Sequence, residues 1–240
     1  MLLMLTGTLT SGKAQNSSVE FWPETDIWYR LSSSWRLSAF VPVTKYNESQ
    51  FRDLNIYLQA DYAWGKTRYI FYTRRVDENR TTTMKAWLLR GGFMEGWSLG
   101  ENAGNYREDM AFAEIHKRIP LLGNFLLSQR IRTDLRWVGE DAVYSYRIRY
   151  RVMAEKEFAG ENSSFVPYIN IEPFWDSRYS KVSRVRVIGG STASWGPKLA
   201  LEANLTYQYD EYYTTTHLYA MNIILHIFFE TTKVKISDAI

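Results

Sequence analysis

Arginine recurs at every second position in the stretch YSYRIRYRV, residues 144–152. Arg147, Arg149 and Arg151 alternate there with aromatic and aliphatic residues. Successive side chains of a β-strand point to opposite faces, so this spacing places three guanidinium groups on one face of a strand. Guanidinium groups bind carboxylates and phosphates, and they are costly to bury without such a partner.

Two further stretches, RIRTDLRW (130–137) and SRVRVIGG (183–190), repeat this alternation of arginine with apolar residues. Carboxylates and an asparagine fall on the same inferred strand faces. We assign these polar side chains to one shared interior, lined by Glu114, Arg130, Arg132, Asp134, Arg136, Arg147, Arg149, Arg151, Asn170, Glu172, Arg184, Arg186 and Glu202. With Glu155, Glu157 and Asp210 added, seven carboxylates stand against eight arginines, which predicts ion pairs rather than an open anion-selective pore.

The elements that must position these residues have a period of two, because apolar and polar residues alternate along most of the chain. In LALEANLTYQY (199–209) the leucines share one face, whereas Glu202 and Asn204 share the other. Helical periodicity is hard to find, and short turn signals separate the alternating runs. The pattern predicts an all-β, antiparallel up-and-down β-barrel of about twelve strands, each of roughly 9–15 residues.

Alternation alone fits two kinds of barrel, because a soluble barrel turns its apolar face inward and a membrane barrel turns it towards lipid. Three features favour the membrane: long strands, an export signal, and aromatic residues at the ends of the apolar faces. Those aromatic residues are Trp137, Trp175, Tyr207, Tyr209, Tyr212 and Tyr213. An arginine facing lipid at the midplane costs about 2–4 kcal/mol, so the arginines must point into a charged Arg/Glu lumen or lie near the membrane edge.

The strand count depends on residues 32–34, SSS. A turn there gives twelve strands, and a continuous strand gives eleven. We choose about twelve because single-chain barrels of the bacterial outer membrane have even strand numbers. The longest stretch with weak alternation is 91–105, GGFMEGWSLGENAGN, and we predict the largest loop there.

The chain divides into three parts. Residues 1–14 are an expected signal peptide, which ends in small residues but is short enough to be truncated at its start. Residues 15–229 form one expected outer-membrane barrel domain, and residues 230–240 form a C-terminal tail. Outer-membrane barrels usually end on an aromatic residue, so the tail departs from that pattern.

Composition excludes several other classes of protein. Cysteine is absent, which excludes disulfides and thiolate metal sites. The chain has 29 Lys+Arg against 26 Asp+Glu, a net charge of +3 that is too balanced for a nucleic-acid binder. The three histidines are dispersed, and no acidic loop has calcium spacing. We predict no metal, no cofactor and no nucleic-acid partner.

Enzymatic chemistry has little support in the sequence. An outer-membrane phospholipase places a serine two residues after its histidine, whereas the residues in that position here are Arg118, Tyr219 and Phe228. A G-x-S-x-G motif is absent as well. His116 with Glu114 is the only nearby pair of a base and a carboxylate on one face, and a solvated or ion-paired interior histidine is the simpler interpretation. We predict no catalytic residues, with an outer-membrane lipid hydrolase as the alternative.

The order of these motifs resembles a family of uncharacterised outer-membrane β-barrels of Gram-negative bacteria, the domain-of-unknown-function family 2490. The resemblance runs from about Trp28 to Phe229 and is carried by IWYRLSSSWRLSAF, FAEIHKRI, RIRTDLRW, YSYRIRYRV, YINIEPFW, RVRVIGG and LALEANLTYQY. It implies a membrane barrel, and it supplies no established activity and no catalytic residues.

These observations lead to a functional expectation. We expect a monomeric outer-membrane barrel that contacts outer-membrane lipids, is inserted by the barrel assembly machinery, and serves as a narrow, porin-like pore or transporter for small solutes. Two alternatives stay open. One is a non-conducting structural or lipid-modifying barrel, and the other is a soluble exported β-barrel that binds an apolar ligand.

Overall fold

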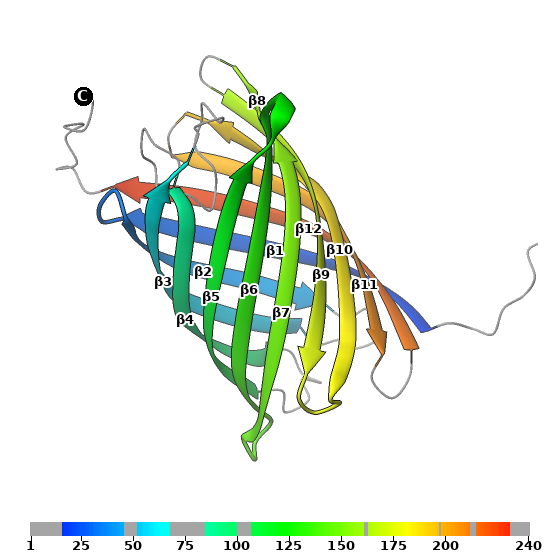
Figure 1. Cartoon of the computed structure of the whole chain (residues 1–240). Helices are drawn as coiled ribbons and strands as arrows, with labels where there is room; N and C mark the ends of the chain where they lie inside the picture. The colour runs from blue at the N-terminus through cyan, green and yellow to red at the C-terminus, as the bar shows by residue number, and fades with distance from the viewer. Residues whose placement is uncertain are drawn as a thin grey trace, which may run out of the picture.

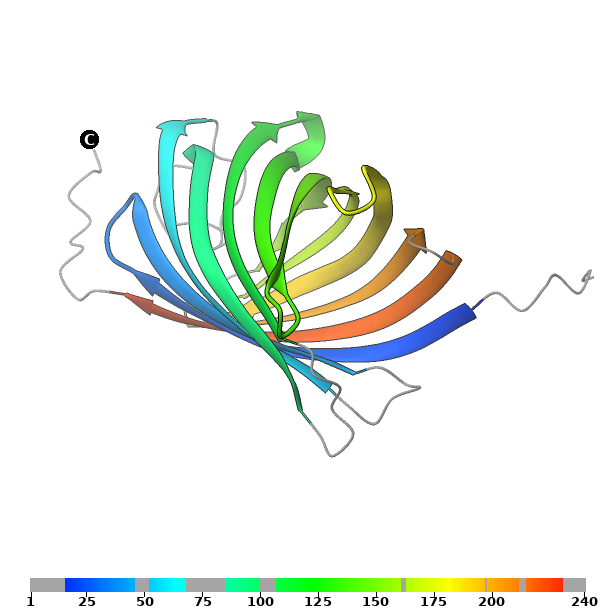
Figure 2. The same cartoon turned by 90° about the horizontal axis from the view of Figure 1, so that it is seen from below.

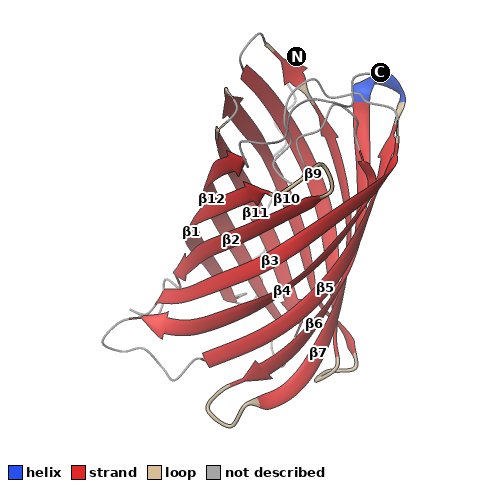
Figure 3. Cartoon of the chain, turned by 90° about the vertical axis from the view of Figure 1, so that its left-hand side faces the viewer, coloured by secondary structure: helices blue, strands red, loops and turns tan. Residues whose placement is uncertain are grey.

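The computed structural model describes residues 16–45, 52–67, 85–99, 107–160, 163–196, 198–211 and 215–230. Within them the chain is almost entirely β-strand, with one short 3-10 helix, η1 (Leu122–Asn124), which Figure 3 shows in blue. The strands are β1 (Asn16–Arg30), β2 (Trp35–Lys45), β3 (Arg52–Lys66), β4 (Lys85–Leu99), β5 (Arg107–Pro120), β6 (Phe125–Val138), β7 (Val143–Lys156), β8 (Phe158–Ala159), β9 (Ser163–Asp176), β10 (Lys181–Trp195), β11 (Leu199–Glu211) and β12 (Thr215–Glu230).

The described strands form one closed β-barrel (Figures 1 and 2). They belong to a twelve-stranded sheet, and leaving out β8, which has two residues and pairs only with β9, gives eleven strands in the barrel wall. Neighbouring wall strands are antiparallel except at the closure, where β1 and β12 run parallel from Asn16 opposite Thr216 to Arg30 opposite Glu230. The β-barrel prediction is confirmed, and the all-antiparallel prediction is wrong at this closure.

The described sheet has twelve strands, close to the predicted count, but eleven of them form the wall, and the expected turn at residues 32–34 lies between β1 and β2. The Ser32 hydroxyl accepts hydrogen bonds there from the backbone N–H groups of Ser34 at 3.2 Å and Trp35 at 3.0 Å. Strand direction alternates along a chain of hairpins, so an odd count leaves the first and last strands pointing the same way. A parallel ladder then satisfies both edges, and the even-number rule does not hold for this chain.

The loop predicted at residues 91–105 is wrong over residues 91–99, where β4 continues and pairs with both β3 and β5, and residues 100–105 lie outside the described residues. The glycines weaken the alternation there for a packing reason. A Cβ atom at Gly92 would lie 2.6 Å from the Leu58 carbonyl oxygen and 2.6 Å from the Phe112 ring. Glycine therefore lets an interior aromatic side chain cross the strand.

Burial is inverted relative to a soluble barrel. Along β5, the polar residues Glu108, Glu114, His116 and Arg118 are buried, whereas Ile115 between them is 37 % exposed. Exposed large apolar side chains occur on every wall strand, with Leu205 on β11 at 67 %. Because the sheet is closed and alternate residues share a face, the buried polar set lies on the inner face and the apolar set on the outer face.

Small apolar clusters also lie among the buried residues. Trp28, Ala200 and Phe228 form one of them beside the β1–β12 closure, with Phe40 packed against it. The Arg36 guanidinium lies 4.0 Å from the centre of the Trp28 ring, so this cluster is in contact with charged groups. Among the described residues, no helix has the length and apolar composition needed to cross a bilayer.

The remaining predictions about the chain ends concern other parts of the sequence. The expected signal peptide (1–14), residues 231–240 of the expected tail, and the aromatic residues Tyr212 and Tyr213 lie outside the described residues. Glu230, the first residue of the expected tail, is the last residue of β12.

Candidate functional site

Strand register brings the predicted arginines together in opposed pairs. Across β6 and β7, Arg130 is opposite Arg151 and Arg132 is opposite Arg149. Like charges at directly opposed positions destabilise a sheet unless carboxylates lie between them. Two carboxylates on the same inner face supply this compensation, one from β6 and one from the next wall strand, β9.

Glu172 on β9 accepts hydrogen bonds from Arg130 at 2.5 Å and from Arg149 at 2.9 and 3.0 Å. Asp134 on β6 accepts hydrogen bonds from Arg132 at 2.5 Å and from Arg147 at 2.8 and 2.9 Å. Each carboxylate thus bridges two guanidinium groups, the charge-assisted geometry that offsets the cost of taking ions out of water.

The pairs of Glu172 and Asp134 with their arginines belong to a larger set of buried ion pairs, which we call the ion-paired layer. This layer extends around the barrel to β2, β3, β4 and β5. Arg90 on β4 donates to Asp61 at 2.6 Å and to Glu114 at 3.0 Å, and Arg36 on β2 donates to Asp61 at 2.8 Å. Asp61 and Asp134 are both 0 % exposed. Both carboxylates are therefore enclosed by the side chains around them.

The layer continues towards one end of the wall through β5, β6 and β9. Arg136 donates to Glu108 at 2.5 and 2.9 Å, and it lies 3.5 Å from Asp176 at the end of β9. In the turn after β9, Arg178 donates to Asp176 at 2.8 and 3.0 Å, and these hydrogen bonds raise the pKa of the Arg178 guanidinium above its ordinary value. The ion pairs therefore continue to the end of β9 and into the turn that follows it.

All thirteen residues assigned to the interior from the sequence are buried or half-buried. The buried ones are Glu114, Arg130, Arg132, Asp134, Arg136, Asn170 and Glu172, and the half-buried ones are Arg147, Arg149, Arg151, Arg184, Arg186 and Glu202. Arg184 pairs with Asp210 at 2.5 Å, and Arg186 donates to the neutral Gln208. That these groups line a passage for solutes stays a prediction.

The predicted base–carboxylate pair is present inside the same layer. His116 Nε2 lies 2.8 Å from Glu114 Oε1, and the histidine is 2 % exposed. Glu114 also accepts a hydrogen bond from Arg90 and lies 3.5 Å from Arg130, so this carboxylate interacts with two arginines as well as with the histidine. This arrangement fits a buried histidine that is hydrogen-bonded to a carboxylate of the layer.

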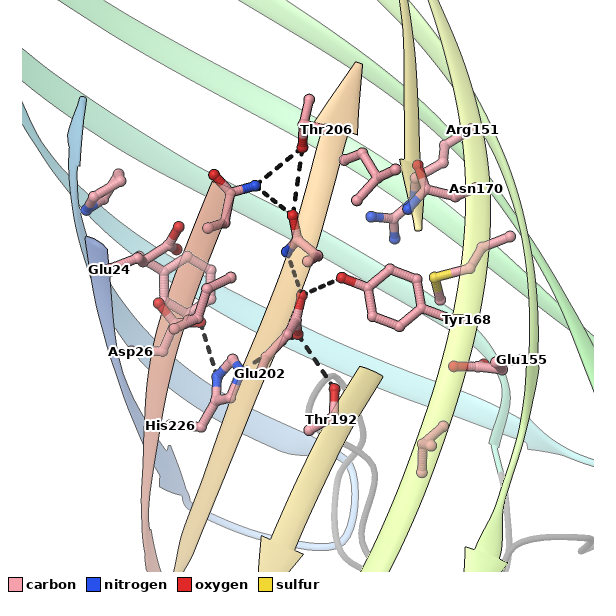
Figure 4. A pocket seen from close by; sticks show the side chains of 18 of the residues that line it. Glu24, Asp26, Arg151, Glu155, Tyr168, Asn170, Thr192, Glu202, Thr206 and His226 are labelled. Carbon is pink, nitrogen blue, oxygen red and sulfur yellow. Dashed lines mark hydrogen bonds and ion pairs between the residues drawn. The ribbon is translucent and has the colours of Figure 1, made fainter. Parts of the chain in front are cut away.

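A cavity of about 330 Å³ opens beside the layer, and its lining includes residues that the sequence reasoning missed (Figure 4). One wall carries Glu24 and Asp26 from β1, Glu202 from β11 and His226 from β12. The facing wall carries Arg151 and Glu155 from β7 together with Tyr168 and Asn170 from β9, and Figure 4 shows Arg151 and Tyr168 directed towards the acidic wall.

The acidic wall is built around one imidazole. His226 Nδ1 lies 3.1 Å from Asp26 Oδ2, and His226 Nε2 lies 3.5 Å from Glu202 Oε2. Glu202 also accepts hydrogen bonds from the Tyr168 hydroxyl, from Thr192 at 3.3 Å and from Asn204 at 3.0 Å. Tyr168 therefore connects the two walls through the Glu202 carboxylate.

Several polar atoms that border the cavity have no hydrogen-bond partner among the described residues. They are Arg130 Nε, Trp28 Nε1, Asp26 Oδ1, Asn170 Oδ1 and Asn222 Oδ1. Arg151 forms no hydrogen bond or ion pair with any residue that the structure describes. Unsatisfied buried polar atoms are costly, so a group of them around one cavity indicates space for a polar ligand.

Metal binding finds no support in the described ranges, where no group of three or more His, Asp or Glu side chains could hold a metal ion. The missed residues had only a partial signal in the sequence. Asp61 belongs to an alternating run, whereas Glu24, Asp26 and His226 reach the cavity only through the parallel pairing of β1 with β12. That pairing joins residues about 200 positions apart, and alternation does not predict it.

Comparison with protein-family models gives a match over most of the chain. The model of a family described as "Protein of unknown function (DUF2490)" matches residues 25–218, most of the barrel wall. No curated protein matches the chain.

Proposed function

The chain belongs to this DUF2490 family of unknown function, and we propose that it is a β-barrel of the bacterial outer membrane that holds small solutes in a narrow, charged interior. In this proposal the barrel acts as a monomer, its outer face contacts lipid, and the barrel assembly machinery inserts it. Its interior side chains bind and position solutes without covalent chemistry.

The observation that carries the proposal is the inverted burial. Large apolar side chains stay exposed on every wall strand, while arginines and carboxylates are buried. A soluble monomer rarely exposes a contiguous apolar patch of more than a few hundred Å². Hydrocarbon chains cover such a belt without cost, and a transmembrane barrel combines an apolar outer face with a polar interior.

The ion-paired layer favours a narrow or closed interior over an open pore. In the layer, Asp61, Asp134 and Glu114 are each exposed by 2 % or less, which leaves no water-filled channel beside them. The adjacent cavity keeps space for a solute within the wall of the same barrel. Passage through the layer would therefore require its ion pairs to separate.

Cell fractionation tests the membrane part of this proposal. The full-length protein should sediment with the outer membrane, resist extraction by salt, and show a heat-dependent shift on gels, as a folded barrel does. Recovery of the protein in the soluble periplasmic fraction would contradict the proposal and favour the soluble exported barrel.

Planar-bilayer recording tests the closed interior. The refolded wild-type protein should insert without the large, stable current steps of a porin. Shortening two side chains of the layer, in the double variant Arg130→Ala and Arg149→Ala, should produce discrete steps by removing two guanidinium groups that fill the interior. Arg107→Ala, whose side chain is 62 % exposed, is the matched control and should behave like wild type. Porin-sized steps from the wild type would refute the closed layer and support an open pore.

A further inference from the structure

Charged groups of both signs line the cavity, and several of its polar atoms have no hydrogen-bond partner among the described residues. We infer that this cavity binds a small zwitterion, with its carboxylate at Arg151 and its ammonium group between Glu24, Asp26 and Glu202. The inference rests on the proposed function only in taking the barrel interior as the place where a solute is held, and it names the chemical class of that solute.

The cationic end of the site is Arg151. Its guanidinium group makes no hydrogen bond or ion pair with any described residue, although it lines the cavity. A guanidinium group presents five N–H donors in a planar fork that fits a carboxylate in two-point contact. The unpartnered Nε of Arg130 lies on the same lining and supplies a further donor.

The anionic end combines three carboxylates with one imidazole. Glu24 and Asp26 are two residues apart on the inner face of β1, and His226 lies between Asp26 and Glu202. The carboxyl groups of Glu24, Asp26 and Glu202 repel one another when they are ionised, so a cation placed among them is favoured. Asp26 Oδ1 is buried without a hydrogen-bond partner and is available to accept from an ammonium group.

An amide on β12 adds a further acceptor to the cavity lining. Asn222 donates to Asn204 and to Thr206 at 3.0 Å, and its Oδ1 atom has no hydrogen-bond donor among the described residues. This oxygen is available to a further N–H or O–H group of the ligand, whereas the ammonium group is placed at the carboxyl groups.

The cavity is small, and part of its lining is apolar. Trp22, Phe40, Met153, Val166 and Ile224 contribute apolar surface to it. A volume of about 330 Å³ lies at the lower end of the range for ligand pockets, so it suits a molecule of amino-acid or dipeptide size. The charge pattern and volume together favour an ammonium and a carboxylate separated by an apolar segment.

Simple ions fit the site less well than a zwitterion. A plain anion would leave the Glu24–Asp26–Glu202 wall without an added cation, and a plain cation would leave Arg151 unpaired. Charged groups buried without a partner carry a large desolvation cost, so a ligand with both charges gains from both walls.

Isothermal titration calorimetry on the detergent-refolded full chain tests the inference with three matched probes. The probes are the dipeptide leucyl-alanine, its N-acetyl derivative, which lacks the ammonium group, and its C-terminal amide, which lacks the carboxylate. The free dipeptide should bind at least tenfold more tightly than either blocked form, because hydrogen bonds to charged groups give that much discrimination.

Two variants assign the ends of the ligand. For Arg151→Gln, the C-terminal amide and the free dipeptide should bind with equal affinity. For Glu24→Gln, the difference in affinity between the free dipeptide and the N-acetyl form should become smaller than in the wild type. Arg107→Gln, whose side chain is 62 % exposed and lies outside the cavity lining, is the control and should retain the wild-type preference. The heat-dependent gel shift establishes that each variant is folded. If one of the two cavity variants does not fold, the other still tests the inference.

The possible outcomes separate this inference from the proposed function. Equal binding of the three probes, tighter binding of a blocked form, or no binding to a folded barrel would each overturn the zwitterion site, even if the protein fractionates with the outer membrane. Discriminating binding by a protein found only in the soluble fraction would support the site and refute the membrane assignment.

Discussion

Removing one carboxylate from the ion-paired layer should destabilise the barrel strongly. Glu172 is 2 % exposed and accepts hydrogen bonds from Arg130 and Arg149. Glu172→Ala would leave both guanidinium groups buried beside a small apolar side chain. Breaking a buried ion pair from one side costs about 3–5 kcal/mol, since the remaining charge loses its compensation.

The expected loss lies at the lower end of that range, because each arginine keeps a more distant carboxylate. Arg130 lies 3.5 Å from Glu114, and Arg149 lies 3.8 Å from Asp134. A loss of about 3 kcal/mol corresponds to a fall in Tm of roughly 6–12 °C for a domain of this length. The Tm of Glu172→Gln, which keeps the volume and one acceptor oxygen, should fall less than the Tm of Glu172→Ala.

Thermal melting in detergent, followed by circular dichroism and by the heat-dependent gel shift, measures this change. Glu140→Ala is the matched control, because Glu140 is exposed in the turn between β6 and β7. Its Tm should stay within about 2 °C of wild type, since exposed groups contribute little. Equal melting temperatures for Glu172→Ala and Glu140→Ala would refute the claim that the layer holds the interior together.

Two further predictions concern the outer face and strand packing. Leu205→Arg, at the centre of β11 on the exposed face, should reduce the yield of inserted barrel, since arginine at the bilayer midplane costs about 2–4 kcal/mol. Leu122→Arg, in η1 between strands, should insert normally, and equal yields in vesicle-refolding assays would contradict a lipid-facing Leu205. Gly92→Ala should lower the unfolding free energy by about 1–3 kcal/mol, because its Cβ would meet Phe112 and a backbone oxygen at 2.6 Å. Gly189→Ala, with no atom within 4 Å of its Cβ, should be neutral or stabilising, and equal denaturant midpoints for both would contradict the close packing.

Alternation predicted the parts of the structure that depend on neighbouring residues. It placed Glu202 and Asn204 opposite the leucines of β11, and it predicted that Arg130, Arg132 and Asp134 share one face. A strand has a fixed period of two, so the face of each residue follows from its position once the strand is recognised. The resemblance to the domain-of-unknown-function family is likewise confirmed over residues 25–218.

Features that depend on pairing across the barrel were beyond sequence reasoning. The Asp26–His226 contact arises because the first and last wall strands run parallel in register, and no local pattern specifies that register. The error over residues 91–99 has a related cause. Gly92 weakens the local strand signal to make room for Phe112 from the next strand, which is a property of two strands together.

The orientation of the side chains relative to lipid is the central claim, and spin-label accessibility measures it most directly. The natural chain has no cysteine, so Leu205→Cys and Thr206→Cys each introduce one labelling site on adjacent residues of β11. In lipid vesicles, the label at position 205 should collide with oxygen dissolved in the bilayer and not with a water-soluble nickel complex. The label at position 206, where Thr206 is 2 % exposed, should be shielded from both reagents. The account would be contradicted if the label at position 205 collided with the nickel complex and the label at position 206 collided with bilayer oxygen.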